Sequence, residues 1–218
     1  MIHMNKILQA PLGKLTAALV LAGVCAGCAP LLLGGAVIGG GLMVTDRRTT
    51  GIQVEDEGIE LRAASRVRGL ATLGQVNVTS YNRTVLLTGE VPGEAEKAAV
   101  AQAVRQVENV REVVNELVVA PNSPLGSRSN DTLLGAKVKA TFVDAKDLQA
   151  NAFKVVADRG VIFLMGRVTE REAARGAELA ASVSGVRKVV RVFELLTEQQ
   201  LGDLGRAAQP AGPAASPR

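Results

Sequence analysis

The chain has 218 residues, of which 47% are hydrophobic, and it carries 25 Lys and Arg against 21 Asp and Glu. This length allows one large or two small domains with a hydrophobic core. The only histidine is His3 and the only cysteines are Cys25 and Cys28, which excludes a Ser-His-Asp or Cys-His nucleophile and a zinc site if this end is removed. Aromatic residues at 2% argue against stacking on nucleic-acid bases. We therefore expect a protein that is not an enzyme, has no metal or cofactor and does not bind nucleic acid.

Residues 1–27 have the pattern of a lipoprotein signal peptide. Lysines precede an apolar run at residues 15–24, which has the length of a signal-peptide hydrophobic region. Two small residues then stand directly before Cys28, which resembles the bacterial lipobox, whose cysteine receives diacylglycerol and, after cleavage, an amide-linked fatty acid such as palmitate. We predict lipidation at Cys28, with Cys25 as the alternative, and Ala29 after it implies the outer membrane rather than the inner membrane.

The next segment, residues 28–45, is expected to be a lipidated tether. No charged residue lies between Lys14 and Asp46, and Pro30 is followed by five glycines within residues 34–41. A transmembrane helix is the alternative interpretation, since about 20 apolar residues span a bilayer. Each glycine costs a helix interior about 1 kcal/mol relative to alanine, so a glycine-rich tether is favoured.

The remainder contains an internal repeat. Residues 76–91 align with residues 153–168 at an offset of 77, which places Gly89 on Gly166. Residues 107–119 align with residues 183–195 at an offset of 76. Two such copies indicate a duplicated small domain. We predict one domain at residues 46–119 and the other at residues 130–197. A polar linker at residues 120–129 joins them, and a disordered tail rich in Ala and Pro follows at residues 198–218.

Each copy has the same predicted order of elements, αββαβ. The first helices are expected at residues 59–69 and 132–143, with Asn130 and Asp131 as N-cap residues of the second. The strand pairs are joined by tight turns, and Gly89 and Gly166 end their strands where a positive φ or close packing is needed. The second helices and last strands are expected at residues 94–107 and 113–119 in one copy and 170–182 and 189–195 in the other. The fold class is therefore α+β, with two helices packed on a small three-stranded sheet in each copy.

These features resemble one family of envelope proteins. The most specific motifs are Thr-Asp-Arg-Arg with Gly51, Asn-Val-Thr, Ser-Asn-Asp-Thr, Phe-Leu-Met-Gly-Arg-Val-Thr-Glu-Arg-Glu-Ala and Val-Ser-Gly-Val, at residues 45–48, 77–79, 129–132, 163–173 and 183–186. With the lipobox and the spacer, they resemble the dual BON-domain outer-membrane lipoproteins, the DolP (YraP) group. The resemblance implies two tandem BON domains and a non-enzymatic lipoprotein on the periplasmic face of the outer membrane. It also implies support of envelope integrity and binding of anionic phospholipid, such as phosphatidylglycerol, through the second BON domain.

The charges of the two copies agree with that expectation. Residues 46–119 have 9 basic and 11 acidic side chains, whereas residues 131–197 have 11 basic and 8 acidic side chains. Basic groups near an anionic bilayer contribute about 1 kcal/mol each, so the second copy is expected to face lipid. Its first helix combines apolar and ammonium groups, as an interfacial helix does, and the predicted phospholipid-binding residues are Leu133, Leu134, Lys137, Val138 and Lys139. The family usually has an aromatic residue in place of Leu133. For Leu134 and Val138 the alternative is that they belong to the core.

Two other functions are alternatives. The protein could be an interaction scaffold or a regulator for outer-membrane assembly or cell-wall remodelling factors. An acid/base enzyme would need carboxylate pairs such as Asp56 with Glu57 or Asp144 with Asp147. These pairs are predicted at exposed helix starts and loops, so catalysis is not expected.

Overall fold

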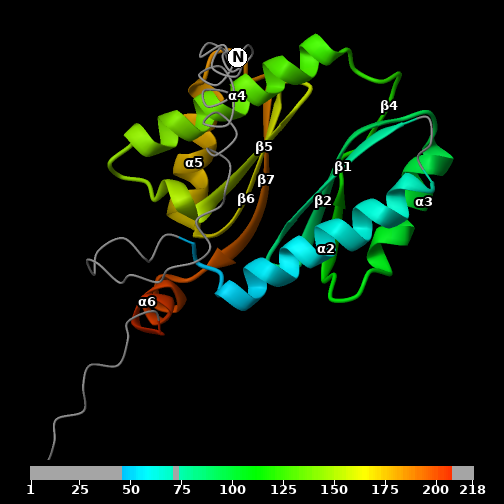
Figure 1. Ribbon diagram of the computed structural model, residues 1–218. Coiled ribbons are helices and arrows are strands. Elements are labelled where there is room, and N and C mark those ends of the chain that lie inside the picture. The colour runs from blue at the N-terminus through cyan, green and yellow to red at the C-terminus, as the bar shows by residue number, and fades with distance from the viewer. Residues whose placement is uncertain (1–45, 71–73, 208–218) are drawn as a thin grey trace, which may run out of the picture. The chain divides into compact units, whose positions relative to one another are not determined.

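The computed structural model describes residues 46–70 and 74–207, with the side chains of 205–207 excepted. The predicted signal peptide, the whole predicted tether with Cys28, and residues 208–218 of the predicted tail lie outside these residues. The first copy consists of α2 (Thr50–Arg68), β1 (Gln75–Tyr81), β2 (Thr84–Val91), α3 (Glu94–Arg105), β3 (Glu112–Asn115) and β4 (Val118–Val119). The second consists of α4 (Leu125–Asp144), the 3-10 turn η2 (Ala150–Ala152), β5 (Phe153–Asp158), β6 (Val161–Thr169), α5 (Glu170–Ser182) and β7 (Lys188–Leu196), and α6 (Glu198–Ala207) follows. The predicted α+β fold with two αββαβ copies is confirmed (Figure 1).

Both sheets have the same mixed topology. β1 and β2 form an antiparallel hairpin, and β3 and β4 each pair parallel to the other side of β2. The second sheet has the order β5-β6-β7, in which β5 is antiparallel and β7 parallel to β6. β3 and β4 therefore correspond to one interrupted strand, because Leu117 between them turns into the core of the first copy.

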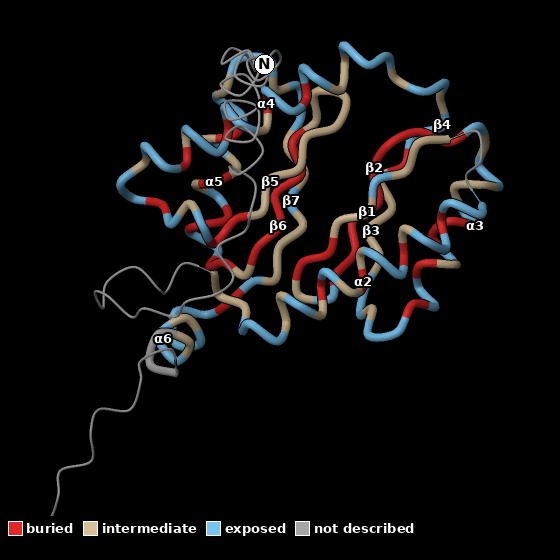
Figure 2. Tube along the Cα trace, in the orientation of Figure 1, coloured by how far each residue is buried: buried red, intermediate tan, exposed pale blue. Residues whose placement is uncertain are grey.

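The sheets pack against each other, and the helices cover their outer faces. α2 and α3 pack on the first sheet, and α4 and α5 pack on the second. The inner faces share an apolar cluster of Tyr81 and Leu86 with Phe163 and Met165. β2 is consequently buried along its whole length and β6 over most of it (Figure 2), which explains the continuous apolar runs of both strands.

The predicted ends of several elements are wrong. α4 begins at Leu125, so residues 125–129 are helical rather than part of the linker. Asn130 and Asp131 therefore lie inside the helix and are not N-cap residues. Pro124 takes the N-cap position, where its missing N–H costs no hydrogen bond.

The predicted disorder of the tail is wrong for residues 198–207, which form α6. Thr197 and Gln200 begin this helix with reciprocal hydrogen bonds, since each backbone N–H donates to the side-chain oxygen of the other residue, at 2.9 and 3.1 Å. This is a capping box, a known start signal of helices.

The two predicted glycine positions need glycine for partly different reasons. Gly89 has φ of +111°, and a Cβ there would lie 2.0 Å from the Gln75 carbonyl oxygen. A Cβ on Gly166 would lie 2.4 Å from the Ala152 carbonyl oxygen, without a positive φ. Both glycines therefore lie too close to a neighbouring carbonyl oxygen for a Cβ, and Gly89 also needs glycine because of its positive φ.

Candidate functional site

The outer face of α4 exposes large apolar side chains. Leu125, Leu133 and Val143 are 77%, 62% and 71% exposed. Leu125 and Val143 are about five helical turns apart and so lie on the same side of α4, and Leu133 lies between them along the helix, roughly 80° around its axis. An apolar stripe of this kind on a surface helix is a candidate contact for a membrane or another protein.

The predicted phospholipid-binding residues separate into two groups. Leu133, Lys137 and Lys139 are exposed on the outer side of α4. Leu134 and Val138 are buried and pack in the core of the second copy with Phe142. The prediction is therefore wrong for Leu134 and Val138, because helix residues that face the sheet cannot reach a bilayer. Leu125 and Val143 were missed.

Basic side chains flank the stripe on both sides. Lys137 lies on one side, whereas Lys139 and Arg128, about three turns apart, lie on the other. Lys139 and Arg128 also line a cavity of about 530 Å³ between α4 and the two sheets. The cavity is further lined by Asp158, whose pKa is raised by burial and by the nearby carboxylates of Glu90 and Asp131.

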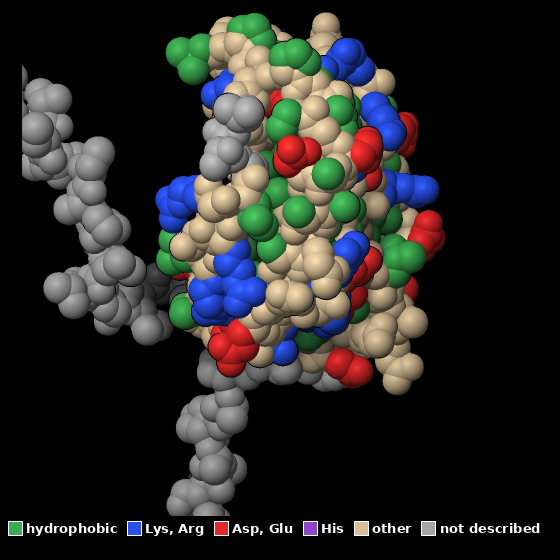
Figure 3. All heavy atoms as spheres, turned by 90° about the vertical axis from the view of Figure 1, so that its right-hand side faces the viewer, with side chains coloured by type: hydrophobic (Ala, Val, Ile, Leu, Met, Phe, Trp, Pro, Cys, Tyr) green, Lys and Arg blue, Asp and Glu red, His purple; other side chains and the backbone are tan. Residues whose placement is uncertain are grey.

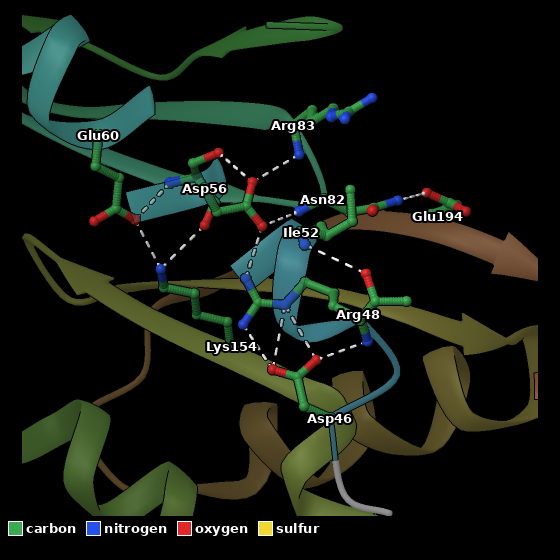
Figure 4. Close-up of polar contacts among 11 residues, drawn as sticks. Asp46, Arg48, Ile52, Asp56, Glu60, Asn82, Arg83, Lys154 and Glu194 are labelled. Carbon is green, nitrogen blue, oxygen red and sulfur yellow. Dashed lines mark hydrogen bonds and ion pairs between the residues drawn. The ribbon is translucent and has the colours of Figure 1, made fainter. Parts of the chain in front are cut away.

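A second polar site lies where the N-terminal segment meets the first copy. The guanidinium of Arg48 is 2.7 Å from the Asp46 carboxylate and 2.8 Å from that of Asp56 (Figure 4). It also stacks 4.2 Å from the ring centre of Tyr81. Burial alone would raise the pKa of Asp56, but hydrogen bonds from the backbone of Arg83, the Ser80 hydroxyl and Arg48 lower it. Asp56 is thus held as a buried carboxylate.

The neighbouring arginine reaches the second copy. Arg47 donates two hydrogen bonds of 2.7 Å to the Glu172 carboxylate and one of 2.8 Å to the Arg167 carbonyl. Arg167 in turn donates to the Arg47 carbonyl at 3.0 Å. Chiefly because of the hydrogen bonds from Arg47, the pKa of Glu172 is lowered. Glu172 also forms the capping box of α5 with Thr169.

Further ion pairs surround the apolar cluster between the sheets. Three of them join a residue of one copy to a residue of the other. They are Lys154–Glu60 at 2.8 Å, Arg159–Glu90 at 3.1 Å and Arg111–Glu194 at 3.0 Å. The Lys154 ammonium also donates to the Ser80 carbonyl, and Asn82 donates to Glu194. The interface between the copies thus has an apolar centre and a charged rim.

The carboxylates that were candidates for acid/base catalysis are either buried in structural hydrogen bonds or lie on the surface. Asp56 is buried and accepts structural hydrogen bonds, while Glu57 is exposed. Asp147 pairs with Arg175 at 2.8 Å on the surface.

Within residues 46–70 and 74–207, no cluster of three His, Cys, Asp or Glu could hold a metal ion. Over the same ranges, none of the helices has the length and apolar character that crossing a bilayer requires.

Comparison with known proteins agrees with this architecture. The BON domain family matches residues 60–121 and 130–197. The outer membrane lipoprotein DolP of Haemophilus influenzae is 38% identical over 190 residues, which cover 85% of this chain and 97% of that protein. A 21 kDa hemolysin of Actinobacillus pleuropneumoniae is 31% identical over 68% of this chain and 78% of that protein. Among solved structures, CdsD, a structural protein of the type III secretion system of Chlamydia trachomatis, has a TM-score of 0.28 at 14% identity and covers 68% of this chain and 99% of that one. The chain belongs to the BON-domain family and is a DolP-like lipoprotein with two BON domains.

Proposed function

We propose that this protein is acylated at Cys28 and anchored to the periplasmic face of the outer membrane, where its second BON domain binds anionic phospholipid and supports envelope integrity. The lipobox and the similarity to an outer membrane lipoprotein support the location. The observation that carries the lipid contact is the exposed apolar stripe of α4 with basic side chains on both sides.

The stripe is suited to the boundary between headgroups and acyl chains. Burying a Leu or Val side chain completely contributes about 1.5–3 kcal/mol, and each nearby Lys contributes about 1 kcal/mol at an anionic surface. α4 would thus attach the protein to the membrane at a second place besides the acyl chains, through Leu133, Val143, Lys137 and Lys139. A surface helix with this composition lies in the interface plane rather than across the bilayer.

Charge distinguishes this helix from its counterpart in the first BON domain. α2 also exposes apolar residues, since Val54 and Leu61 are 64% and 73% exposed. Acidic residues adjoin Val54, and the first BON domain has an excess of acidic groups. On the side of α2 and α3, hydrophobic side chains are interspersed with acidic and basic ones (Figure 3). Anionic lipid should therefore prefer α4 over α2.

Vesicle flotation of the fragment 46–207, which lacks both native cysteines, tests the proposal. We expect binding to vesicles with phosphatidylglycerol and weak binding to neutral phosphatidylcholine vesicles. Lys137→Glu with Lys139→Glu should weaken binding more than the control pair Arg62→Glu with Arg66→Glu, which introduces the same charge change on α2. No flotation with anionic vesicles, or equal losses for the two pairs, would refute the assignment.

A scaffold for an outer-membrane assembly or cell-wall remodelling protein is a second candidate. The observation that favours it is the exposed pair Val54 and Leu61 on the acidic first BON domain. Photocrosslinking from position 61 in cells would then capture a protein, and crosslinking from position 133 would capture lipid. Crosslinks to lipid from both positions would contradict the scaffold function.

A further inference from the structure

We propose that residues 46–48, here termed the arginine clasp, lock the two BON domains against each other and that breaking the clasp lets the two sheets separate. The clasp is a conformational device and does not depend on the proposed lipid contact. Asp46, Arg47 and Arg48 precede α2, the first helix of the first BON domain, yet Arg47 contacts the second domain.

The two arginines are adjacent in the chain but are held by different domains. Arg48 is fixed in the first BON domain by Asp56 and by the Tyr81 ring. Arg47 is fixed in the second by the carboxylate of Glu172 and the carbonyl of Arg167. One peptide bond therefore joins two anchor points, and separation of the domains must break the contacts of one arginine.

Among the ion pairs that join the two domains in the described part of the chain, Arg47–Glu172 is the most enclosed. The side chains of Arg47 and Glu172 are 9% and 6% exposed, and the guanidinium meets the carboxylate with two parallel hydrogen bonds. Such a fork is directional and stronger than a single ion pair. By contrast, Arg111 on the rim is exposed and Lys154 is partly exposed, and ion pairs contribute less as their exposure to solvent increases.

The apolar centre of the interface is small, so the clasp matters for holding the two domains together. The shared apolar cluster has four buried residues, two from each domain, with five partly buried valines packed against it, whereas the core of each domain has eleven buried residues. Loss of the clasp should therefore leave both domains folded. It would uncover the inner faces of the sheets, so the clasp controls whether these apolar faces are accessible.

The experiment measures the distance between the domains in the full mature, acylated chain. Nitroxide labels are placed on cysteines introduced at positions 61 and 133, on the outer faces of α2 and α4; the native Cys28 is expected to be blocked by the lipid. Pulsed electron resonance should give one narrow distance distribution for the parent protein. Arg47→Ala should add a broad population at longer distances, and hydrogen exchange of the β2 and β6 amides should accelerate roughly tenfold or more.

Two controls separate a lock from general destabilisation. Arg175→Ala removes an arginine that pairs with Asp147 and Glu178 within the second domain, and it should leave the distribution narrow. Arg47→Lys keeps the charge but loses the fork, and it should broaden the distribution less than Arg47→Ala. A narrow, unchanged distribution for Arg47→Ala, or equal broadening for Arg47→Ala and Arg175→Ala, would overturn the proposal. Circular dichroism of each variant identifies one that fails to fold, and Arg47→Lys then decides the question.

Discussion

Asp56 and Asp131 perform the same task in the two BON domains, since each carboxylate accepts hydrogen bonds from both backbone N–H groups of its own hairpin turn. The distances are 2.7 and 2.8 Å for the Asn82 and Arg83 nitrogens and 2.8 Å for both nitrogens of the other turn. All four turn residues have positive φ, a strained conformation for residues other than glycine. A buried aspartate on the first helix thus holds the tight turn of each domain.

The two aspartates differ in their remaining partners. Asp56 also accepts from the Arg48 guanidinium and the Ser80 hydroxyl. At the corresponding positions of the second domain the sequence has Ser123 and Ala157. Asp131→Asn should therefore lower the free energy of unfolding by about 1–3 kcal/mol, the cost of one unsatisfied buried group. Asp56→Asn should cost about 3–5 kcal/mol, since it also leaves a buried guanidinium without its charge partner.

Urea denaturation of both variants measures these losses, with the exposed Asp144→Asn as a control that should change stability little. A loss for Asp131→Asn as large as that for Asp56→Asn would show that Arg48 adds nothing to the turn.

Asp158 should destabilise the protein at neutral pH. Its pKa is raised by burial and by Glu90 and Asp131, so the folded state binds this proton more tightly than the unfolded state. Stability is therefore reduced above the folded pKa, and the penalty disappears as the pH falls toward the unfolded value of about 3.9. Asp158→Asn should raise the free energy of unfolding at pH 7, and this gain should shrink toward zero at pH 4. Denaturation at both pH values checks this, and a gain that is equal at pH 4 and pH 7 would contradict it.

Gly89 and Gly166 lie inside β2 and β6 rather than at the predicted strand ends, and they should respond differently from a glycine in a helix. Gly89→Ala and Gly166→Ala place a Cβ against a carbonyl oxygen, and Gly89→Ala also strains the backbone, so both should lower the melting temperature and Gly89→Ala by more. Gly126 in α4 has open space around its Cβ position, and Gly126→Ala should raise stability by up to about 1 kcal/mol. Thermal unfolding orders the three variants, and a neutral Gly89→Ala would contradict the strain argument.

Lipidation should depend on Cys28 alone. Metabolic labelling with an alkyne palmitate should be abolished by Cys28→Ala and unaffected by Cys25→Ala. Labelling that is lost with Cys25→Ala and retained with Cys28→Ala would move the acceptor to the alternative cysteine.

The internal repeat made the fold predictable, but it did not show where every helix begins and ends. Aligning the two copies identified the hairpins and the order of helices and strands. The start of α4 was missed because Gly126, Ser127 and Ser129 are typical of loops; residues 125–130 are helical although none of them is buried. α6 was missed although the Thr197-to-Gln200 spacing is a helix-start signal.

The candidate lipid surface was only partly predictable for a related reason. Helical spacing groups residues on faces, but the position of the sheet decides which face is inside. Leu134 and Val138 face the second sheet, whereas Leu133 next to them points outward. The packing of the two sheets could have been suspected from the continuous apolar run of β6, which is typical of a strand buried on both faces.

The most direct test of the lipid contact measures how deeply α4 enters the bilayer. A nitroxide on a single cysteine at position 133 of the fragment 46–207 is compared with one at position 61, an exposed leucine on α2. In vesicles with phosphatidylglycerol, the label at 133 should become more accessible to oxygen and less accessible to a water-soluble nickel complex, while the label at 61 stays in water. If neither label enters the bilayer, or if both enter equally, the assignment of α4 as the membrane-binding surface is contradicted.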